Sequence, residues 1–88
     1  MRTETVEIYS DATNAAVMRH PGRRFPGVLI QGDTLASLVG QVDRIRREEG
    51  GAEEAAEALA EVHEHLKELL QHYKNVLVSH SLELPFRD

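Results

Sequence analysis

The sequence contains no cysteine and, in 88 residues, only two phenylalanines and two tyrosines. Without cysteine there can be no disulfide, no thiol nucleophile and no thiolate ligand for a metal. So few aromatic rings leave no platform on which nucleic-acid bases could stack. No apolar run reaches the ~18 residues of a membrane span, and the N-terminal MRTETVEIYS has no apolar signal segment. We therefore expect a cytoplasmic protein that makes no membrane contact and carries no cofactor.

The net charge of −5 is unevenly distributed along the chain. Residues 19–47 carry six arginines against two aspartates, whereas residues 48–88 carry three basic against ten acidic residues. An acidic chain is a poor nucleic-acid binder unless its basic part forms one face. The charge pattern therefore favours a protein partner over a nucleic acid.

Three short segments have the pattern of strands. Val6, Ile8 and Tyr9 alternate with polar residues, which predicts a strand with one buried face over residues 5–9. A second strand is expected over residues 15–19, and the apolar run 27–31 predicts a central strand that follows two Pro-Gly turns. Gly32 allows a sharp turn, after which Asp33 or Thr34 is expected to cap a helix.

Two helices follow in the sequence. The first is predicted to end at Glu49, because Gly50-Gly51 favours a short turn between helices. The second is predicted over residues 52–79 and the C-terminal tail is apolar. The apolar stripe of the first helix consists of Leu35, Leu38, Val39, Val42 and Ile45.

The second helix indicates self-association. At 1.5 Å per residue it is ~40 Å long, whereas a compact chain of this size has a radius of gyration of only ~12 Å. Its apolar stripe would overhang the rest of the chain, and a second copy is the simplest cover. We expect a homodimer or a higher oligomer. The expected interface residues are Leu59, Val62, Leu66, Leu69, Tyr73 and Val76.

A histidine–glutamate stripe on the same helix has the spacing of possible metal ligands. Its members are Glu61, His65, Glu68 and His72, at i, i+4, i+7 and i+11. Two imidazoles and two carboxylates can hold zinc, with further ligands from a facing helix. The alternative is that they are flanking residues that form i,i+4 pairs.

A basic turn precedes the central strand. It consists of Arg19, His20, Arg23 and Arg24. Arginines beside glycine-rich backbone can hold phosphate or carboxylate, so the turn is a candidate anion- or partner-binding site. A solvated hairpin turn is the alternative, and no GxxxxGK[ST] motif is present. No spacing of nucleophile, base and orienting group is recognisable, so we expect no enzyme.

Two resemblances rest on this region. The run from Val6 to Leu35, VEIYSDATNAAVMRHPGRRFPGVLIQGDTL, resembles a family of small bacterial proteins that is a domain of unknown function. The shorter FPGVLIQGDTLASL is similar to the strand–turn–helix segment of HicB-type antitoxins. That resemblance implies a sheet-and-helix domain that occupies a toxin partner. The chain departs from that family after the first helix, where a long acidic helix replaces any DNA-binding module.

Strands followed by helices predict an α+β fold, with a small antiparallel sheet of about three strands and then a helical hairpin with a long second arm. We expect a single domain over residues 1–88, with a strand region (1–32), a first helix (33–49), a second helix (52–79) and a tail (80–88). The expected function is a non-catalytic interaction module of the antitoxin or immunity type that self-associates and contacts another bacterial protein. A small anion or metabolite binder that uses the arginine-rich turn is the alternative.

Overall fold

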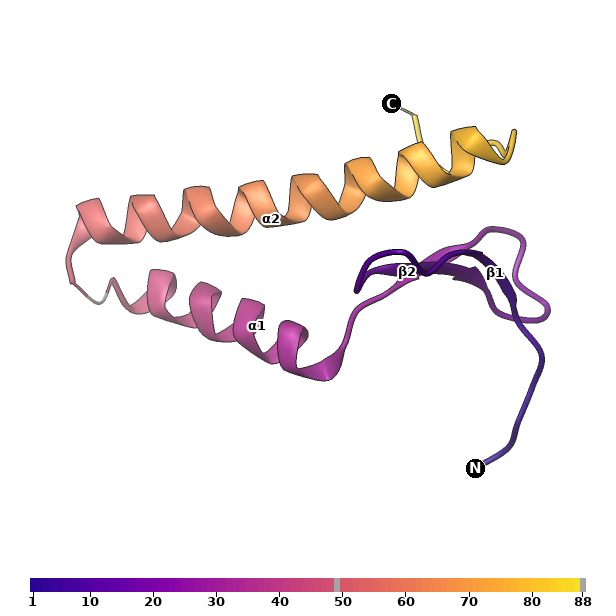
Figure 1. Cartoon of the computed structure of the whole chain (residues 1–88). Helices are drawn as coiled ribbons and strands as arrows, with labels where there is room; N and C mark the ends of the chain where they lie inside the picture. Colours follow the sequence, from indigo (N-terminus) through magenta and orange to yellow (C-terminus); the bar gives the residue numbers. More distant parts are fainter. Residues whose placement is uncertain (49, 88) are drawn as a thin grey trace. The chain divides into compact units, whose positions relative to one another are not determined.

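The computed structural model describes residues 1–48 and 50–87 and has the predicted α+β fold. Its elements are β1 (Glu7–Ser10), β2 (Ala16–Arg19), β3 (Gly27–Leu29), α1 (Gly32–Arg47) and α2 (Ala52–Ser79), as Figure 1 shows. The chain divides into two compact units. The sheet unit is Met1–Ile30 with the chain from Leu70 onward, and the helical unit is Gln31–Leu69. The single domain expected from the chain length stays a prediction.

The sheet is antiparallel, with β2 between β1 and β3. Val17 of β2 lies opposite Val28 of β3, and it is completely buried. The register of β1 shifts between Ile8 and Ser10, which marks a β-bulge at Tyr9. Tyr9 packs on the core side, whereas Ile8, which lies opposite Met18, is 56% exposed on the outer side, as the alternation of side chains along a strand requires. The buried face of this strand is therefore that of Tyr9.

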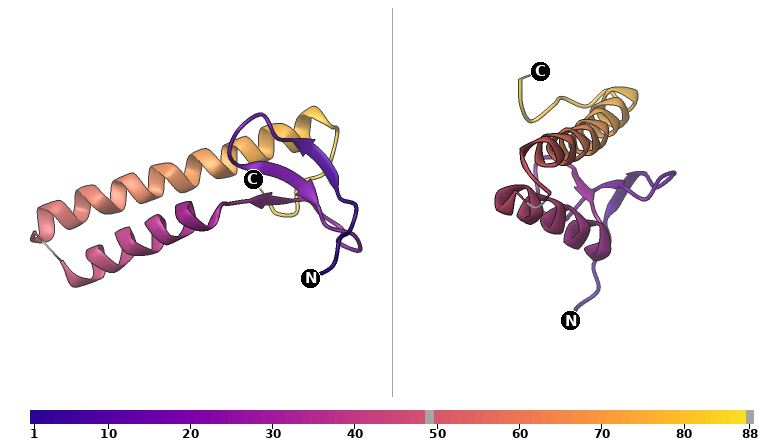
Figure 2. Two further views of the ribbon diagram at one scale, coloured as in Figure 1. Left: turned by 60° about the horizontal axis from the view of Figure 1, so that its bottom comes forward. Right: turned by 90° about the vertical axis from the view of Figure 1, so that its left-hand side faces the viewer.

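The core of the sheet unit forms between one face of the sheet and the C-terminal part of α2, which Figures 1 and 2 show beside the strands. Apolar residues at helical spacing on α2 meet alternating apolar residues of the strands, so each element buries one face. The apolar tail after α2 turns back and packs Leu82 and Leu84 on this core. The buried members are Val17, Tyr73, Val76 and Leu77.

The helical unit consists of α1 and residues 52–69 of α2, which run side by side in opposite directions (Figure 2). The turn between them begins at Glu48, whose left-handed backbone (φ 52°) directs its N–H to the carbonyls of Arg44 and Ile45. Gly50 and Gly51 follow with φ of 84° and 94°, a conformation that favours glycine. The described helix therefore ends at Arg47, and the predicted last residue, Glu49, lies outside the described residues.

The start of α1 also differs from the prediction. The helix begins at Gly32, its N-cap is Gln31, and no side chain of the cap bonds to the backbone. Asp33 instead lies in the first turn, where its carboxylate accepts the N–H of Thr34 at 2.9 Å. An acidic side chain at this place is favoured by the partial positive charge of the helix N-terminus. Asp33 therefore stabilises the helix from inside the first turn, and the predicted cap at Asp33 or Thr34 is wrong.

Candidate functional site

Arg19 is neutralised by an acidic partner on the neighbouring strand. The register places Arg19 of β2 opposite Glu7 of β1. The guanidinium donates to the Glu7 carboxylate through Nε at 2.8 Å and also through Nη2. These hydrogen bonds lower the pKa of Glu7 and raise the pKa of Arg19. Arg19 is thus part of an exposed cross-strand pair, and it leaves the basic turn with one cation fewer than the sequence indicates.

The turn between β2 and β3 holds the other predicted residues. The N–H of Arg23 donates to the His20 carbonyl at 3.1 Å, and Gly22 between them has φ 80°. His20 donates from Nδ1 to the Pro21 carbonyl at 2.9 Å. The Arg24 guanidinium lies 5.0 Å from the centre of the Phe25 ring, within range of a cation–π interaction. Within residues 1–48 and 50–87, neither Arg23 nor Arg24 makes an ion pair.

This turn borders a hollow of about 500 Å³ on the outer face of the sheet. Val6, Met18 and Leu29 contribute apolar side chains from three neighbouring strand segments, and Leu29 is 53% exposed. The hollow thus combines an apolar floor with a basic border, a composition typical of ligand and partner sites. The border residues are His20, Arg23, Arg24 and Phe25. The sequence identified the basic border of this site but not its apolar floor, because alternation predicts one buried face and does not show that the other face is apolar too.

The position of the turn is fixed from the opposite face of the sheet. The Tyr73 hydroxyl of α2 donates to the Pro26 carbonyl at 2.6 Å, and both residues are buried. Burial raises the pKa of Tyr73, because its ionised form would lose hydration. The backbone that forms one wall of the hollow is therefore held by a long-range hydrogen bond to the core helix.

A second apolar surface lies on the helical unit. Leu35, Val39 and Val42 of α1 are 55%, 60% and 42% exposed, so only Leu38 of the predicted stripe is buried. On α2, Leu59 and Leu66 are 56% and 49% exposed. They line a shallow apolar hollow of about 520 Å³ together with neighbours one turn apart, namely Ala56, Ala60, Val62 and His63.

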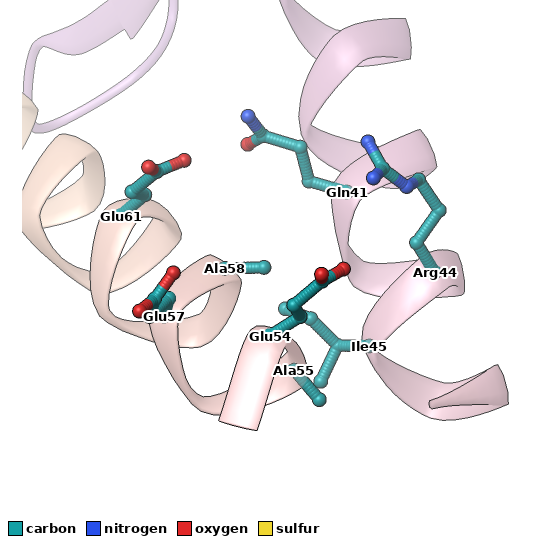
Figure 3. A pocket seen from close by; sticks show the side chains of 8 residues that line it. All are labelled: Gln41, Arg44, Ile45, Glu54, Ala55, Glu57, Ala58 and Glu61. Carbon is teal, nitrogen blue, oxygen red and sulfur yellow. The ribbon is translucent and has the colours of Figure 1, made fainter. Parts of the chain in front are cut away.

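The space between the two helices is lined by more charged side chains than the outer apolar hollow is. A hollow of about 250 Å³ separates α1 from α2 near the turn (Figure 3). Gln41, Arg44 and Ile45 line it from α1. The lining from α2 consists of Glu54, Ala55, Glu57, Ala58 and Glu61. Among the described residues of the helical unit, five large apolar side chains are exposed, whereas Leu38 and Val62 are the buried ones.

The predicted oligomer-interface residues divide into two groups. Tyr73 and Val76 belong to the core of the sheet unit, and Val62 is also buried. Leu59 and Leu66 are exposed, and Leu69 is intermediate. Only the exposed members can contact a second copy without unfolding the chain.

The histidine–glutamate stripe is not brought together as a metal centre. Within the described part of the chain, no three histidine or acidic side chains lie close enough to hold a metal ion. Glu61, His65 and Glu68 lie in the helical unit. His72 lies in the sheet unit, where its Nε2 is 3.2 Å from the Ala15 carbonyl and 3.3 Å from the Thr13 hydroxyl.

The contacts of His72 also determine which ring nitrogen donates a hydrogen bond. A carbonyl oxygen can only accept, so Nε2 must carry the proton in order to bond to Ala15. A protonated Nε2 cannot act as a base toward the Thr13 hydroxyl, which already accepts the N–H of Ala15 at 3.2 Å. His72 therefore fastens the β1–β2 connection to α2. His80 does the same for β1, because its Nε2 donates to the Tyr9 carbonyl at 2.9 Å.

Comparison with known proteins gives one match. Residues 1–86 match the family model described as "Family of unknown function (DUF6959)", so the chain belongs to that family. This confirms the expected family of unknown function, and it carries no statement about HicB-type antitoxins. No curated protein and no solved structure matches the chain. In the described part of the chain, no helix is both long and apolar enough to cross a membrane.

Proposed function

We propose that this member of the DUF6959 family is a non-catalytic protein-interaction module that self-associates through the outer apolar face of its helical hairpin. The observation that carries the proposal is the exposure of large apolar side chains on both helices at regular spacing. They are Leu35, Val39 and Val42 on α1 and Leu59 and Leu66 on α2. Exposed apolar stripes of this kind are rare on monomers and typical of interaction sites.

Helical geometry places both stripes on one side of the hairpin. Each residue turns a helix by about 100°. On α1, Ile45 lines the hollow between the helices, and Val39 and Val42 are turned by about a quarter turn from it. On α2, Ala58 lines the same hollow, and Leu59 is turned in the same rotational sense. Because the helices are antiparallel, equal rotations bring the two stripes to the same side.

The opposite side of the hairpin is polar. It carries Ser37 on α1 and Glu64 and Glu68 on α2, all exposed, and it borders the charged hollow between the helices. The sequence of α2 agrees with a helix that has two neighbours. Its apolar residues occupy adjacent stripes, one with Ala55 and Val62 and the other with Leu59 and Leu66. Apolar positions a, d and g of a heptad are the pattern of a helix in a bundle, so two hairpins stacked face to face would form a four-helix bundle.

The apolar face offers a burial free energy of the same size as the cost of association. Burial of a whole leucine or valine side chain contributes about 1.5–3 kcal/mol, so one that is half exposed offers about 1 kcal/mol more. Five such residues in each copy offer roughly 10 kcal/mol, within the range of roughly 4–15 kcal/mol that association costs. A symmetric pair is therefore the expected assembly, since one face complements itself about a two-fold axis.

Double substitution of the face tests the proposal. Leu59→Lys with Leu66→Lys is expected to convert the assembly to a monomer in sedimentation velocity at micromolar concentration. Glu64→Lys with Glu68→Lys places the same side chains at exposed positions on the polar side of the same helix, outside the hollow between the helices, and it is expected to leave the assembly intact. Circular dichroism verifies that both variants keep their helix content. A wild-type chain that sediments as a monomer would refute the proposal.

Small-anion binding is the second candidate function, and it is favoured by Arg23 and Arg24, which make no ion pair with any residue that the structure describes. Two guanidinium groups beside backbone N–H groups can hold a phosphate. Stabilisation of the wild-type chain by millimolar phosphate, lost in Arg23→Gln with Arg24→Gln, would support it. The apolar floor of the adjoining hollow argues for a larger ligand than an inorganic anion.

A further inference from the structure

The hollow on the outer face of the sheet is a second partly apolar surface, in the sheet unit. Its floor is apolar, with Val6, Met18 and Leu29 from three neighbouring strand segments. Ile8 extends the apolar surface of this sheet face beyond the hollow and is 56% exposed. Because this surface crosses three neighbouring strand segments and is partly exposed, it suits an extended segment better than a compact small molecule.

The charge of its border determines the chemistry of the occupant. Arg23 and Arg24 line the hollow, and neither has an ion-pair partner in the part of the chain that the structure describes. Arg19, in contrast, is engaged with Glu7. Guanidinium groups form strong, often bidentate hydrogen bonds with carboxylates. The occupant should therefore present carboxylates to Arg23 and Arg24 and an apolar side chain to the floor.

The hollow is also preformed. The Pro26 backbone that borders it is fixed by the buried hydrogen bond to Tyr73, and the His20–Arg23 turn is closed by its own backbone hydrogen bond. A rigid site loses little conformational freedom on binding, which increases affinity for a flexible segment.

We propose that this hollow docks an extended segment of another protein in which one apolar residue stands next to two or more Asp or Glu residues. The inference rests on the proposed interaction role, but it uses a surface in the other unit, so either proposal can fail without the other. The inference specifies the chemistry of the partner segment, which the proposed interaction role does not.

Selection from a phage-displayed library of random dodecapeptides on the immobilised wild-type chain tests the inference. The enriched sequences are expected to carry an apolar residue within four positions of at least two acidic residues. Enrichment of sequences without acidic residues, or no enrichment, would overturn the proposal. If free phosphate abolishes the enrichment and chloride at the same ionic strength does not, the arginines bind a small anion instead, and the proposal is overturned.

The peptide with the strongest enrichment is then synthesised with a fluorescent label and titrated with each variant. Arg23→Gln with Arg24→Gln is expected to weaken binding by roughly tenfold or more, because two charge-assisted contacts are lost. Leu29→Gln is expected to weaken binding as well. Arg2→Gln with Arg87→Gln changes the net charge equally at exposed positions outside the hollow, and it should bind as the wild type does.

The hairpin variant separates this proposal from the preceding one. Leu59→Lys with Leu66→Lys should retain peptide binding even when the chain is monomeric. If instead Arg23→Gln with Arg24→Gln dissociates the assembly, the basic turn is an interface between copies of this chain, and the proposal is overturned. Equal loss of peptide affinity in the arginine pair and in its matched control would overturn it too.

Discussion

Removal of one buried hydroxyl tests how the sheet unit is held together. Tyr73 is 7% exposed, and its hydroxyl donates to the buried Pro26 carbonyl at 2.6 Å. Tyr73→Phe keeps the ring but leaves that carbonyl without a donor, which costs about 1–2 kcal/mol of unfolding free energy. For a domain of this size each kcal/mol lowers Tm by about 4–8 °C. Thermal and urea unfolding followed by circular dichroism measure the difference.

Tyr9→Phe is the matched control. Its hydroxyl donates to Glu7 at 3.2 Å in an exposed position, and such a change should alter the stability by less than about 0.5 kcal/mol. Equal stability of Tyr73→Phe and the wild type would refute the assignment of the Pro26 bond.

The pH dependence supplies a second readout. Burial raises the pKa of Tyr73, so above pH ~10 the unfolded tyrosine loses its proton before the folded one does. The folded state then binds more protons, and the wild type should lose stability as the pH rises through this range. Tyr73→Phe lacks this contribution, so its stability should fall less steeply with pH. Parallel curves for the two proteins would contradict the burial of the hydroxyl.

Further predictions concern a glycine turn, an exposed ion pair and the core. Gly50→Ala should lower the free energy of unfolding by roughly 1 kcal/mol, because Gly50 has φ of 84°. Gly40→Ala, in the interior of α1, should raise it by roughly 0.5–1 kcal/mol. Urea unfolding measures both. The Arg19 hydrogen bond lowers the pKa of Glu7, so stability should fall as the pH drops from ~5 to ~3, and Glu7→Gln should flatten that part of an acid titration. Leu77 is fully buried, so Leu77→Ala should cost about 2–5 kcal/mol in the same urea assay.

Local signals in the sequence suffice for most of the elements. The apolar run after Pro26-Gly27 predicts β3, and the periodic leucines and valines predict both helices close to their observed bounds. The ends of α1 are not predicted by these local signals. Glu48 has a left-handed backbone conformation, which is usually adopted by glycine. The helix therefore ends before Gly50 and Gly51. The β-bulge at Tyr9 likewise depends on strand pairing, which has no local signature.

The candidate sites are harder to foresee, because their geometry depends on contacts between distant residues. The sequence identifies the basic turn, but only the register of β1 with β2 shows that Glu7 neutralises Arg19. The bond from Tyr73 to Pro26 joins residues 47 positions apart. The helix stripe is visible in the sequence as one surface, whereas the structure separates its buried residues from its exposed ones.

The molar mass of the wild-type chain in solution tests the central claim most directly. We predict that light scattering coupled to size exclusion, at micromolar concentration, gives at least twice the chain mass of 9.9 kDa. We also predict that Leu59→Lys with Leu66→Lys gives the mass of one folded chain. A single-chain mass for the wild type across that concentration range would contradict the account.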